Sequence, residues 1–305
     1  MKKISLSERA NMIIKSNPSL TAMKPVIEKE LIHYDIFFLL QQKNLILPEM
    51  TFIGGTCLRL CHGSNRYSED LDFHAGSHFK PADFDKIRLE LERYLYDRYQ
   101  FLTEVRSPKQ LTYTSENCVS HAHTWKVIIQ MHPTQKNIPS QRIHIDIANI
   151  PTHEAIPMAI NTNYSDLPDG YNTMLIRGSS KNEILADKLI AIPARNNIKA
   201  RDLWDIIWLQ QQSTKIDIDL IRKKIEDHAM TQYKVRLEAR INEVPSYFET
   251  KHFVQEMSRF LDSQRLSKTV MNPDFIEFAK TKIIQTLTDL HRRLYSKSTE
   301  ATFVL

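Results

Sequence analysis

The sequence has few of the residues that mark disulfide-bonded or membrane-spanning proteins. Its three cysteines, Cys57, Cys61 and Cys118, are odd in number and irregularly placed, which indicates reduced thiols in a cytoplasmic protein rather than a disulfide framework. No apolar run reaches the roughly 20 residues that span a bilayer, and the start of the chain lacks the apolar core of a signal peptide. The sequence therefore predicts a cytoplasmic protein with no membrane anchor.

Glycine and proline are also scarce, and neither sign of charge dominates. Six glycines and 13 prolines argue against long disordered linkers, so the 305 residues allow one large domain or two modest ones. The net charge of +5 is mildly basic, which permits binding to nucleic acid but does not require it.

A pair of glycines joins a short strand to a helix near residue 54. The apolar run Thr51–Ile53 is typical of the end of a strand, and Gly54 and Gly55 then form a tight turn that only glycine makes at low cost. A helix that follows such a turn offers free backbone N–H groups to anionic phosphate. The sequence predicts that Gly54, Gly55 and Thr56 hold the phosphates of a ligand.

Two acids follow on the next predicted strand, Ser68–Phe73. Side chains of a strand alternate between its faces, so Asp70 and Asp72 point the same way, about 7 Å apart. Two such acids repel each other unless they are solvated or share a divalent cation, and Mg²⁺ usually shares its oxygen ligands with substrate phosphates. Arg66 and Ser68 add a cation and a hydroxyl just before the acids. Together with the glycine turn, they predict a site for a metal-bound nucleoside triphosphate; a solvated acidic face is the alternative.

Three stretches of the sequence together resemble the AbiEii/AbiGii family, the nucleotidyltransferase toxins of type IV toxin–antitoxin and abortive-infection systems. The central stretch, GGTCLRL followed by GSNRYSEDLDF, has the glycine pair, helix and Asp-x-Asp of DNA polymerase β-like nucleotidyltransferases. The stretch before it, KPVIEKELIHYDIFFLLQQ, is similar to the family's leading helix. The stretch after it, EILADKLIAIPARNNIKARDLWDIIWL, is similar to its helices with Lys and Arg-Asp-x-x-Asp. The resemblance covers about residues 22–210 and is specific.

The resemblance implies a fold, a reaction and partners. The fold would be α/β (α+β), a mixed sheet flanked by helices, followed by an all-helical C-terminal domain. The protein would transfer a nucleotide from an NTP, with Mg²⁺ or Mn²⁺, to a tRNA 3′ end, blocking translation, and a cognate antitoxin would restrain it. Two alternatives stay open: transfer to a protein hydroxyl, and a non-catalytic nucleotide- or RNA-binding protein.

A third acid lies on a later predicted strand. In residues 142–150, Ile143, Ile145 and Ile147 share one face, and Asp146 lies on the other. The resemblance places this strand beside the Asp-x-Asp strand and makes Asp146 a third metal ligand. The alternative is a surface acid on an edge strand.

A lysine lies inside the apolar arc of the helix that opens with the capping box Ser180–Glu183. At 100° per residue Lys188 falls between Ile184 and Ile192, so it needs an anion as a partner. That anion is either a structural acid or the phosphates of the nucleotide, and the resemblance favours phosphate.

The next predicted helix, residues 200–211, is apolar almost all round yet carries Arg201, Asp202 and Asp205. Buried charges must be paired or functional. The resemblance implies that acids of this helix complete the active site with Lys188, and we assign Arg201 to nucleotide binding. Which of Asp202 and Asp205 is catalytic stays open, and the other is expected to pair with Lys188, Arg195 or Arg201.

The predicted domain boundary lies at Ser213–Lys215, with a nucleotidyltransferase domain over residues 1–212 and a helical domain over 213–305. The stretch from 151 to 172 shows little pattern and is predicted as a loop. For an RNA acceptor, the helical domain offers a cationic path, which comprises Arg222, Lys223, Lys224, Lys234, Arg236, Arg240, Arg292 and Arg293.

Overall fold

A computed structural model describes most of the chain. It covers residues 4–108, 114–115, 118–119, 122–131, 139–165 and 167–296. The side chain of Cys118 lies outside this description, whereas Cys57 and Cys61 are buried free thiols. No helix among the described residues is long and apolar enough to cross a membrane.

The core of the molecule is a mixed seven-stranded sheet, which confirms the predicted α/β class. The strands in sheet order are β3 (Leu102–Arg106), β6 (Ala122–Gln130), β7 (Gln141–Ala148), β2 (Leu71–His74), β1 (Thr51–Ile53), β9 (Leu175–Ser179) and β8 (Ala155–Ala159). The strands β4 (Thr114–Ser115) and β5 (Cys118–Val119) form a separate pair. Strand β8 lies in the stretch predicted to be a loop, so that prediction was wrong for these five residues.

The central strands fix the positions of the predicted site. Strand β2 pairs antiparallel with β1 and parallel with β7, and β1 also pairs parallel with β9. Beyond β7 the sheet continues with the antiparallel strands β6 and β3. Strand β2 begins at Leu71, three residues later than predicted, so Asp70 lies just before it.

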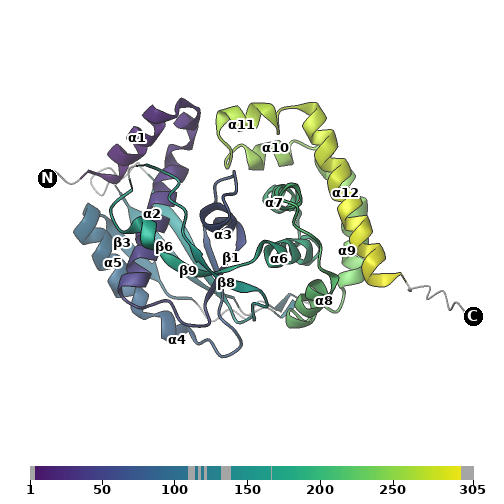
Figure 1. Cartoon of the computed structure of the whole chain (residues 1–305), viewed down its shortest axis with the longest axis horizontal. Coiled ribbons are helices and arrows are strands. Elements are labelled where there is room, and N and C mark those ends of the chain that lie inside the picture. The colour runs from purple at the N-terminus through teal and green to yellow at the C-terminus, as the bar shows by residue number, and fades with distance from the viewer. Residues whose placement is uncertain are drawn as a thin grey trace, which may run out of the picture.

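One face of the sheet is apolar and covered by helices. The helices α2 (Lys24–Gln42) and α5 (Lys86–Tyr99) lie on the left of the sheet in Figure 1, α5 being preceded by the short α4 (Pro81–Phe84). Phe37 of α2 packs edge-on against Phe52 of β1, 4.8 Å between ring centroids. Phe84 packs in the same way against Trp125 of β6, at 5.1 Å. The side chains that alternate with this core therefore point to the opposite face.

Helices fill the right-hand side of Figure 1 and the top of the molecule. They include α6 (Lys181–Ala194), α7 (Ala200–Gln211), α8 (Ile218–Asp227), α9 (Tyr233–Glu249), α10 (His252–Met257), α11 (Ser263–Lys268) and α12 (Pro273–Tyr295), whereas α3 (Gly54–Cys61) lies near the centre. The N-terminal helix α1 (Leu6–Ser16) and two short 3₁₀ turns, Pro18–Met23 and Tyr171–Thr173, complete the set.

A buried ion pair joins α8 to α6. Lys224 is fully buried, and its ammonium lies 2.7 Å from Glu183 and 2.6 Å from Asp187. Ser180 caps α6 as predicted, but Glu183 does not close the box: its carboxylate accepts hydrogen bonds from the backbone of residues 153 and 154. The helices beyond residue 212 thus pack directly on α6, and the predicted domain boundary stays a prediction.

The predicted cationic path is therefore wrong in part. Lys224 is buried and paired with two carboxylates. Arg240 is 9% exposed and donates to the backbone oxygens of Ile192 and Arg195. The Lys224 ammonium and the Arg240 guanidinium are therefore not free to bind a phosphate of a nucleic acid, because both are bound to α6 or to Arg195, which follows it.

Candidate active site

A left-handed glycine turn brings the N-terminus of α3 against the acids of β2. Gly54 has a φ of +75°, and a Cβ added to it would lie 2.6 Å from Oδ2 of Asp72. A Cβ on Gly55 would lie 3.0 Å from Oγ of Ser68 and would collide with the guanidinium of Arg66. Only glycine fits at these two positions. The structure thus brings together most of the residues predicted to hold phosphate.

Three carboxylates share the polar face of the sheet beside this turn. Asp72 of β2 is in register with Asp146 of the parallel neighbour β7, and adjacent strands lie about 4.8 Å apart. Asp70 precedes Asp72 by two residues on the same face. The structure therefore places Asp146 beside the Asp-x-Asp pair. We call Asp70, Asp72 and Asp146 the acid triad.

The acid triad carries uncompensated negative charge. Burial and the charges of Asp146 and Asp70 raise the pKa of Asp72 to about 7, although Lys188 and Arg195 act in the opposite direction. Burial and the charge of Asp70 also raise the pKa of Asp146, despite its hydrogen bond from Thr124. A cation bound here would relieve the repulsion.

The donor set of the triad fits a hard divalent cation. Oδ1 of Asp70 accepts from the backbone N–H of His144 at 3.1 Å, and Oδ1 of Asp146 accepts from the Thr124 hydroxyl at 2.5 Å. The Asp72 carboxylate accepts no hydrogen bond from any described residue. No three His, Cys, Asp or Glu side chains in the described ranges already converge as a ligand set. Two carboxylates plus substrate phosphates are nevertheless a common arrangement for Mg²⁺.

A second set of charges lies next to the triad and alternates in sign. Nε and Nη2 of Arg66 each lie 2.6 Å from a carboxylate oxygen of Asp205. Nζ of Lys188 lies 2.9 Å from Asp205 and 2.7 Å from Asp202, and Nε of Arg195 lies 2.9 Å from Asp202. We call these five residues the charge ladder.

Every buried charge of the ladder is stabilised by an opposite neighbour. Burial would raise the pKa of Asp202, but Lys188 and Arg195 outweigh it and lower the pKa to about 2. Arg66 and Lys188 likewise lower the pKa of Asp205, and the two acids raise the pKa of Lys188 against its burial. Of the two anions that the sequence allowed for Lys188, the structure supplies the structural acid, as Asp202 and Asp205.

The ladder also holds the loop between α3 and β2, which carries Asp70. Arg66 belongs to this loop, and Trp204 of α7 donates from its indole nitrogen to Asn65 at 3.1 Å. The hydroxyl of Thr56 donates to the backbone oxygen of Asp70. Thr56 therefore holds the backbone of the residue that carries one of the acids.

Arg201 is the predicted nucleotide-binding residue that does not join the other site residues. Its guanidinium pairs with Glu256 at 3.3 Å and lies 4.9 Å from the ring centroid of Phe260. These residues line a cavity of about 590 Å³. Glu69, the residue before Asp70, forms part of its wall. The cavity thus adjoins the acid triad, because Glu69 in its wall is bonded directly to Asp70.

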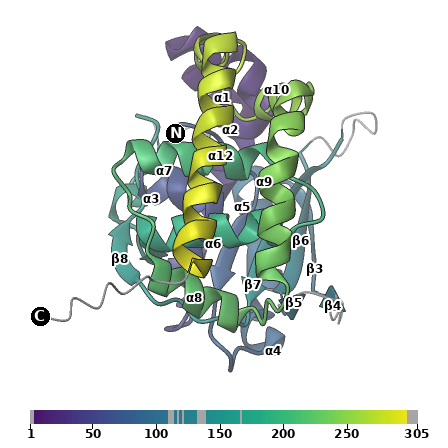
Figure 2. The same ribbon diagram turned by 90° about the vertical axis from the view of Figure 1, so that its right-hand side faces the viewer.

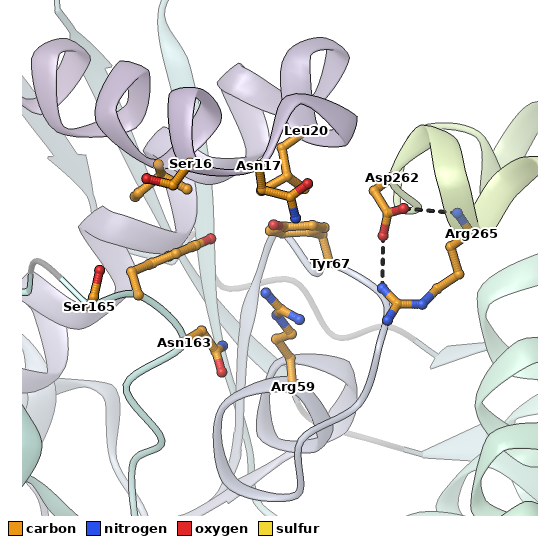
Figure 3. A pocket seen from close by; sticks show the side chains of 11 residues that line it. Ser16, Asn17, Leu20, Arg59, Tyr67, Asn163, Ser165, Asp262 and Arg265 are labelled. Atoms are coloured by element: carbon orange, nitrogen blue, oxygen red, sulfur yellow. Dashed lines mark hydrogen bonds and ion pairs between the residues drawn. The ribbon is translucent and has the colours of Figure 1, made fainter.

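A smaller cavity of about 280 Å³ lies between α1, α3 and α11 (Figure 3). Two arginines point toward it, and both already have carboxylate partners. Arg59 pairs with Glu30, and Arg265 pairs with Asp262, as the dashed lines show for the latter. Because no member of the acid triad lines this cavity and its cations are paired, it lacks the features of a metal–nucleotide site.

Sequence reasoning missed two residues that contact the triad. His144 approaches Asp70 with both its backbone nitrogen and Nδ1, the latter at 3.2 Å, and Thr124 donates to Asp146. His144 could have been found as the polar neighbour two residues before Asp146 on the same face. Thr124 could not, because its contact depends on the register of β6 against β7.

One family model and several solved structures are similar to this chain. Residues 38–281 match the family model described as nucleotidyl transferase AbiEii toxin, type IV TA system. No curated protein matches significantly. The solved structure of the nucleotidyltransferase toxin MenT4 from Mycobacterium tuberculosis is similar at 16% identity and a TM-score of 0.49, with 94% of this chain and 99% of that chain covered.

Two structures from Helicobacter pylori are similar as well. One is a candidate nucleotidyltransferase at 17% identity and a TM-score of 0.47, covering 87% of this chain and 96% of that one. The other is JHP933, at 16% identity and a TM-score of 0.44, covering 87% and 94%. These three structures are too distant in sequence to assign a role to any residue of this chain, so only the match to the family model indicates its family.

Proposed function

The chain belongs to the AbiEii family of nucleotidyl transferase toxins of type IV toxin–antitoxin systems, and from this premise we propose a metal-dependent transfer of a nucleotide to RNA. The acceptor is the 3′ end of a tRNA, and the added nucleotide stops translation. Membership of the family makes the protein a nucleotidyltransferase and implies an antitoxin partner. That partner restrains the transfer.

The observation that carries the proposal is the acid triad beside the glycine turn. Asp70, Asp72 and Asp146 supply hard oxygen ligands on one face of the sheet. The pKa of Asp72 is raised, and its carboxylate accepts no hydrogen bond from a described residue. These carboxylates would hold Mg²⁺ or Mn²⁺. Such ions, when bound, polarise the α-phosphate and activate the attacking hydroxyl.

The chain's own residues bind the triphosphate and balance its charge. The N–H groups at the start of α3, which no side chain caps, and the hydroxyl of Ser68 hold phosphate oxygens. Arg66 lies directly behind Gly55, and the ladder has three cations against two anions. Arg66 and Lys188 thus stabilise the departing pyrophosphate through space, while they stay paired with Asp202 and Asp205.

The chemical step exchanges one P–O bond for another. The oxygen of the acceptor hydroxyl bonds to the α-phosphorus as the bond from that phosphorus to the bridging oxygen of the β-phosphate breaks. Pyrophosphate leaves with that electron pair, and the hydroxyl proton passes to solvent. The nucleoside lies in the cavity of about 590 Å³, where Arg201 lies over Phe260 and Glu69 adjoins the triad.

The test is to follow labelled nucleotide into its acceptor. The protein is incubated with Mg²⁺, each α-³²P-labelled NTP in turn, total tRNA and cell lysate, and RNA and protein fractions are separated. We expect label at the 3′ end of tRNA with the wild type and none with Asp72→Asn. Label in protein would establish the alternative protein acceptor, and a folded wild type that labels neither fraction would contradict nucleotidyl transfer to either class.

A further inference from the structure

The polar face of the sheet stays open beyond the acid triad. Strands β6 and β3 reach the edge of the sheet, and Figure 2 shows them at the right of the view, beyond α9. On this face Lys126, Gln130 and Arg142 are exposed, and Arg106 is 59% exposed at the far strand. The opposite face of the same strands carries the buried core, so these side chains have no core to enter.

Strand register arranges these residues in rows that start at the triad. Asp72 of β2 is in register with Asp146 of β7 and then with Thr124 of β6, which forms the first row. The neighbouring row begins at Asp70, two residues earlier. It continues through residue 144 of β7, residue 126 of β6 and residue 106 of β3.

The second row is therefore His144, Lys126 and Arg106, and it runs from Asp70 to the sheet edge. At about 4.8 Å between strands, its length is about 14 Å. Arg142 lies two residues before His144 on the same face of β7. We call Lys126, Arg142 and Arg106 the basic row.

The basic row has cations with no ion-pair partner among the described residues or with only an exposed one, although Lys126 lowers the pKa of Asp146 through space. Neither Lys126 nor Arg142 forms an ion pair with a described residue. Arg106 pairs with Glu104, but both are more than half exposed, so this pair contributes little and exchanges readily. Exposed cations on a polar surface next to catalytic acids are the arrangement that attracts a phosphate backbone.

We propose that the basic row binds the single-stranded 3′ end of the acceptor RNA and leads its terminal hydroxyl to Asp146. This inference rests on the proposed function, because it assumes an RNA acceptor. Lys126 and Arg142 hold backbone phosphates next to the triad, and Arg106 holds one at the sheet edge. The acceptor reaches the triad from the β7 side, opposite the Gly54–Gly55 turn that holds the triphosphate.

The C-terminal helices offer a weaker path. Lys224 and Arg240 are buried and paired, and on α12 both Arg292 and Arg293 approach Asp289, at 2.5 and 3.9 Å. No strand register connects these residues to the acids. The pair Arg292 and Arg293 therefore serves as a matched control, because it removes the same two charges from a different surface.

The experiment compares Lys126→Ala/Arg142→Ala with Arg292→Ala/Arg293→Ala. Binding of fluorescent deacylated tRNA is titrated between 50 and 200 mM salt, and KM values for tRNA and NTP are measured in Mg²⁺. For each RNA phosphate that is no longer neutralised, the slope of log affinity against log salt concentration should fall in magnitude by about one. The variant Lys126→Ala/Arg142→Ala, the sheet variant, should therefore show a slope smaller by about two and should bind tRNA about tenfold more weakly. The KM for NTP should change less than about twofold, because the triphosphate turn is intact. The control should match the wild type.

The outcomes separate the inference from the function on which it rests. If the wild type labels tRNA but the sheet variant binds it with unchanged affinity and slope, the basic row is overturned and the proposed function stands. If the control pair shows the weaker binding instead, the C-terminal path is the right one. If the wild type labels no RNA, the proposed function fails first. An unchanged Tm in the sheet variant shows that any weakening is not unfolding.

Discussion

The acid triad and the charge ladder use the same residue type in opposite ways. Asp72 is partly buried and Asp202 is buried, and Lys188 favours the charged form of both, yet the pKa of Asp72 is raised to about 7 and that of Asp202 is lowered to about 2. The other neighbours make the difference. Asp72 faces two other acids, whereas Asp202 lies between Lys188 and Arg195.

The comparison distinguishes the acids of the triad, which have no lysine or arginine at bonding distance among the described residues, from the acids of the charge ladder, which each have two. The ladder is complete without a ligand, so it stabilises the fold and holds the loop with Asp70. The triad is incomplete, so its energy falls when a cation binds. Residues of the same type can thus be assigned to the scaffold or to the site by the sign of the charges around them.

The largest effect should come from removing a charge at the centre of the ladder. Asp205→Asn leaves the buried cations Arg66 and Lys188 without that charge, and we expect a loss of about 3–5 kcal/mol in the free energy of unfolding. Urea unfolding at pH 7 measures it. The stability that Asp202 contributes is present above about pH 4 and is lost as pH falls towards about 2, because folding lowers its pKa, and Asp205, whose pKa is also lowered, acts in the same direction. A change below about 1 kcal/mol would contradict a structural role.

Lys188→Met should cost less, since each acid keeps an arginine. Asp205 retains Arg66 and Asp202 retains Arg195, so we expect a loss of about 2–3 kcal/mol, and methionine fits the apolar surroundings. Urea unfolding measures the loss, and single-turnover transfer at saturating NTP measures the activity that remains. A variant that is inactive but fully as stable as the wild type would show that Asp202 and Asp205 do not need Lys188, and it would break the comparison.

Gly54→Ala should affect the two regions differently. The left-handed φ of +75° strains any side chain, and the new Cβ would lie 2.6 Å from Asp72, so we expect a loss of about 1–3 kcal/mol. Transfer should be lost almost entirely, because the turn and the carboxylate must both shift. Gly63→Ala has the same φ of +75° and open space around it, which makes it the matched control. Equal activity in the two variants would contradict the role of the turn.

Asp72→Asn should give the smallest change in stability, and the change should be a gain. Folding raises the pKa of Asp72 from 3.8 to about 7. The contribution of Asp72 to the free energy of unfolding is therefore greatest below about pH 4 and falls as pH rises to about 7. Removing the charge should therefore stabilise the protein by on the order of 1 kcal/mol at pH 8, with little effect at pH 4. Thermal unfolding at both pH values measures it. Destabilisation at pH 8 would place Asp72 among paired acids.

Local patterns predicted the triad better than the ladder. The glycine pair, the two-residue spacing of Asp70 and Asp72 and the alternation around Asp146 are visible within a few residues, because turns and strands have short periods. The sequence also predicted that Lys188 needs an anion, since its place in an apolar arc is a helical-period argument. Only the placement of the Asp146 strand beside the Asp-x-Asp strand needed more than local pattern, and the family resemblance supplied it.

Long-range pairing was beyond the sequence. Arg66 was assigned to phosphate, but its partner Asp205 lies 139 residues away, and no local signal brings them together. The same holds for Lys224, which was placed on a surface path and lies buried against α6. Strand β8 was missed because Pro157 and its short apolar run suggest a loop, although an edge strand tolerates proline.

One measurement tests most directly whether the triad waits for a cation. Thermal unfolding of the wild type and Asp72→Asn is followed at pH 5 and pH 8, with and without MgCl₂ and without nucleotide. Because the pKa of Asp72 is about 7, protons compete with Mg²⁺ at pH 5 and not at pH 8. We predict that Mg²⁺ raises the Tm of the wild type by about 2–4 °C at pH 8, much less at pH 5, and not at all in Asp72→Asn. An equal rise at both pH values, or the same rise in Asp72→Asn, would contradict the metal site.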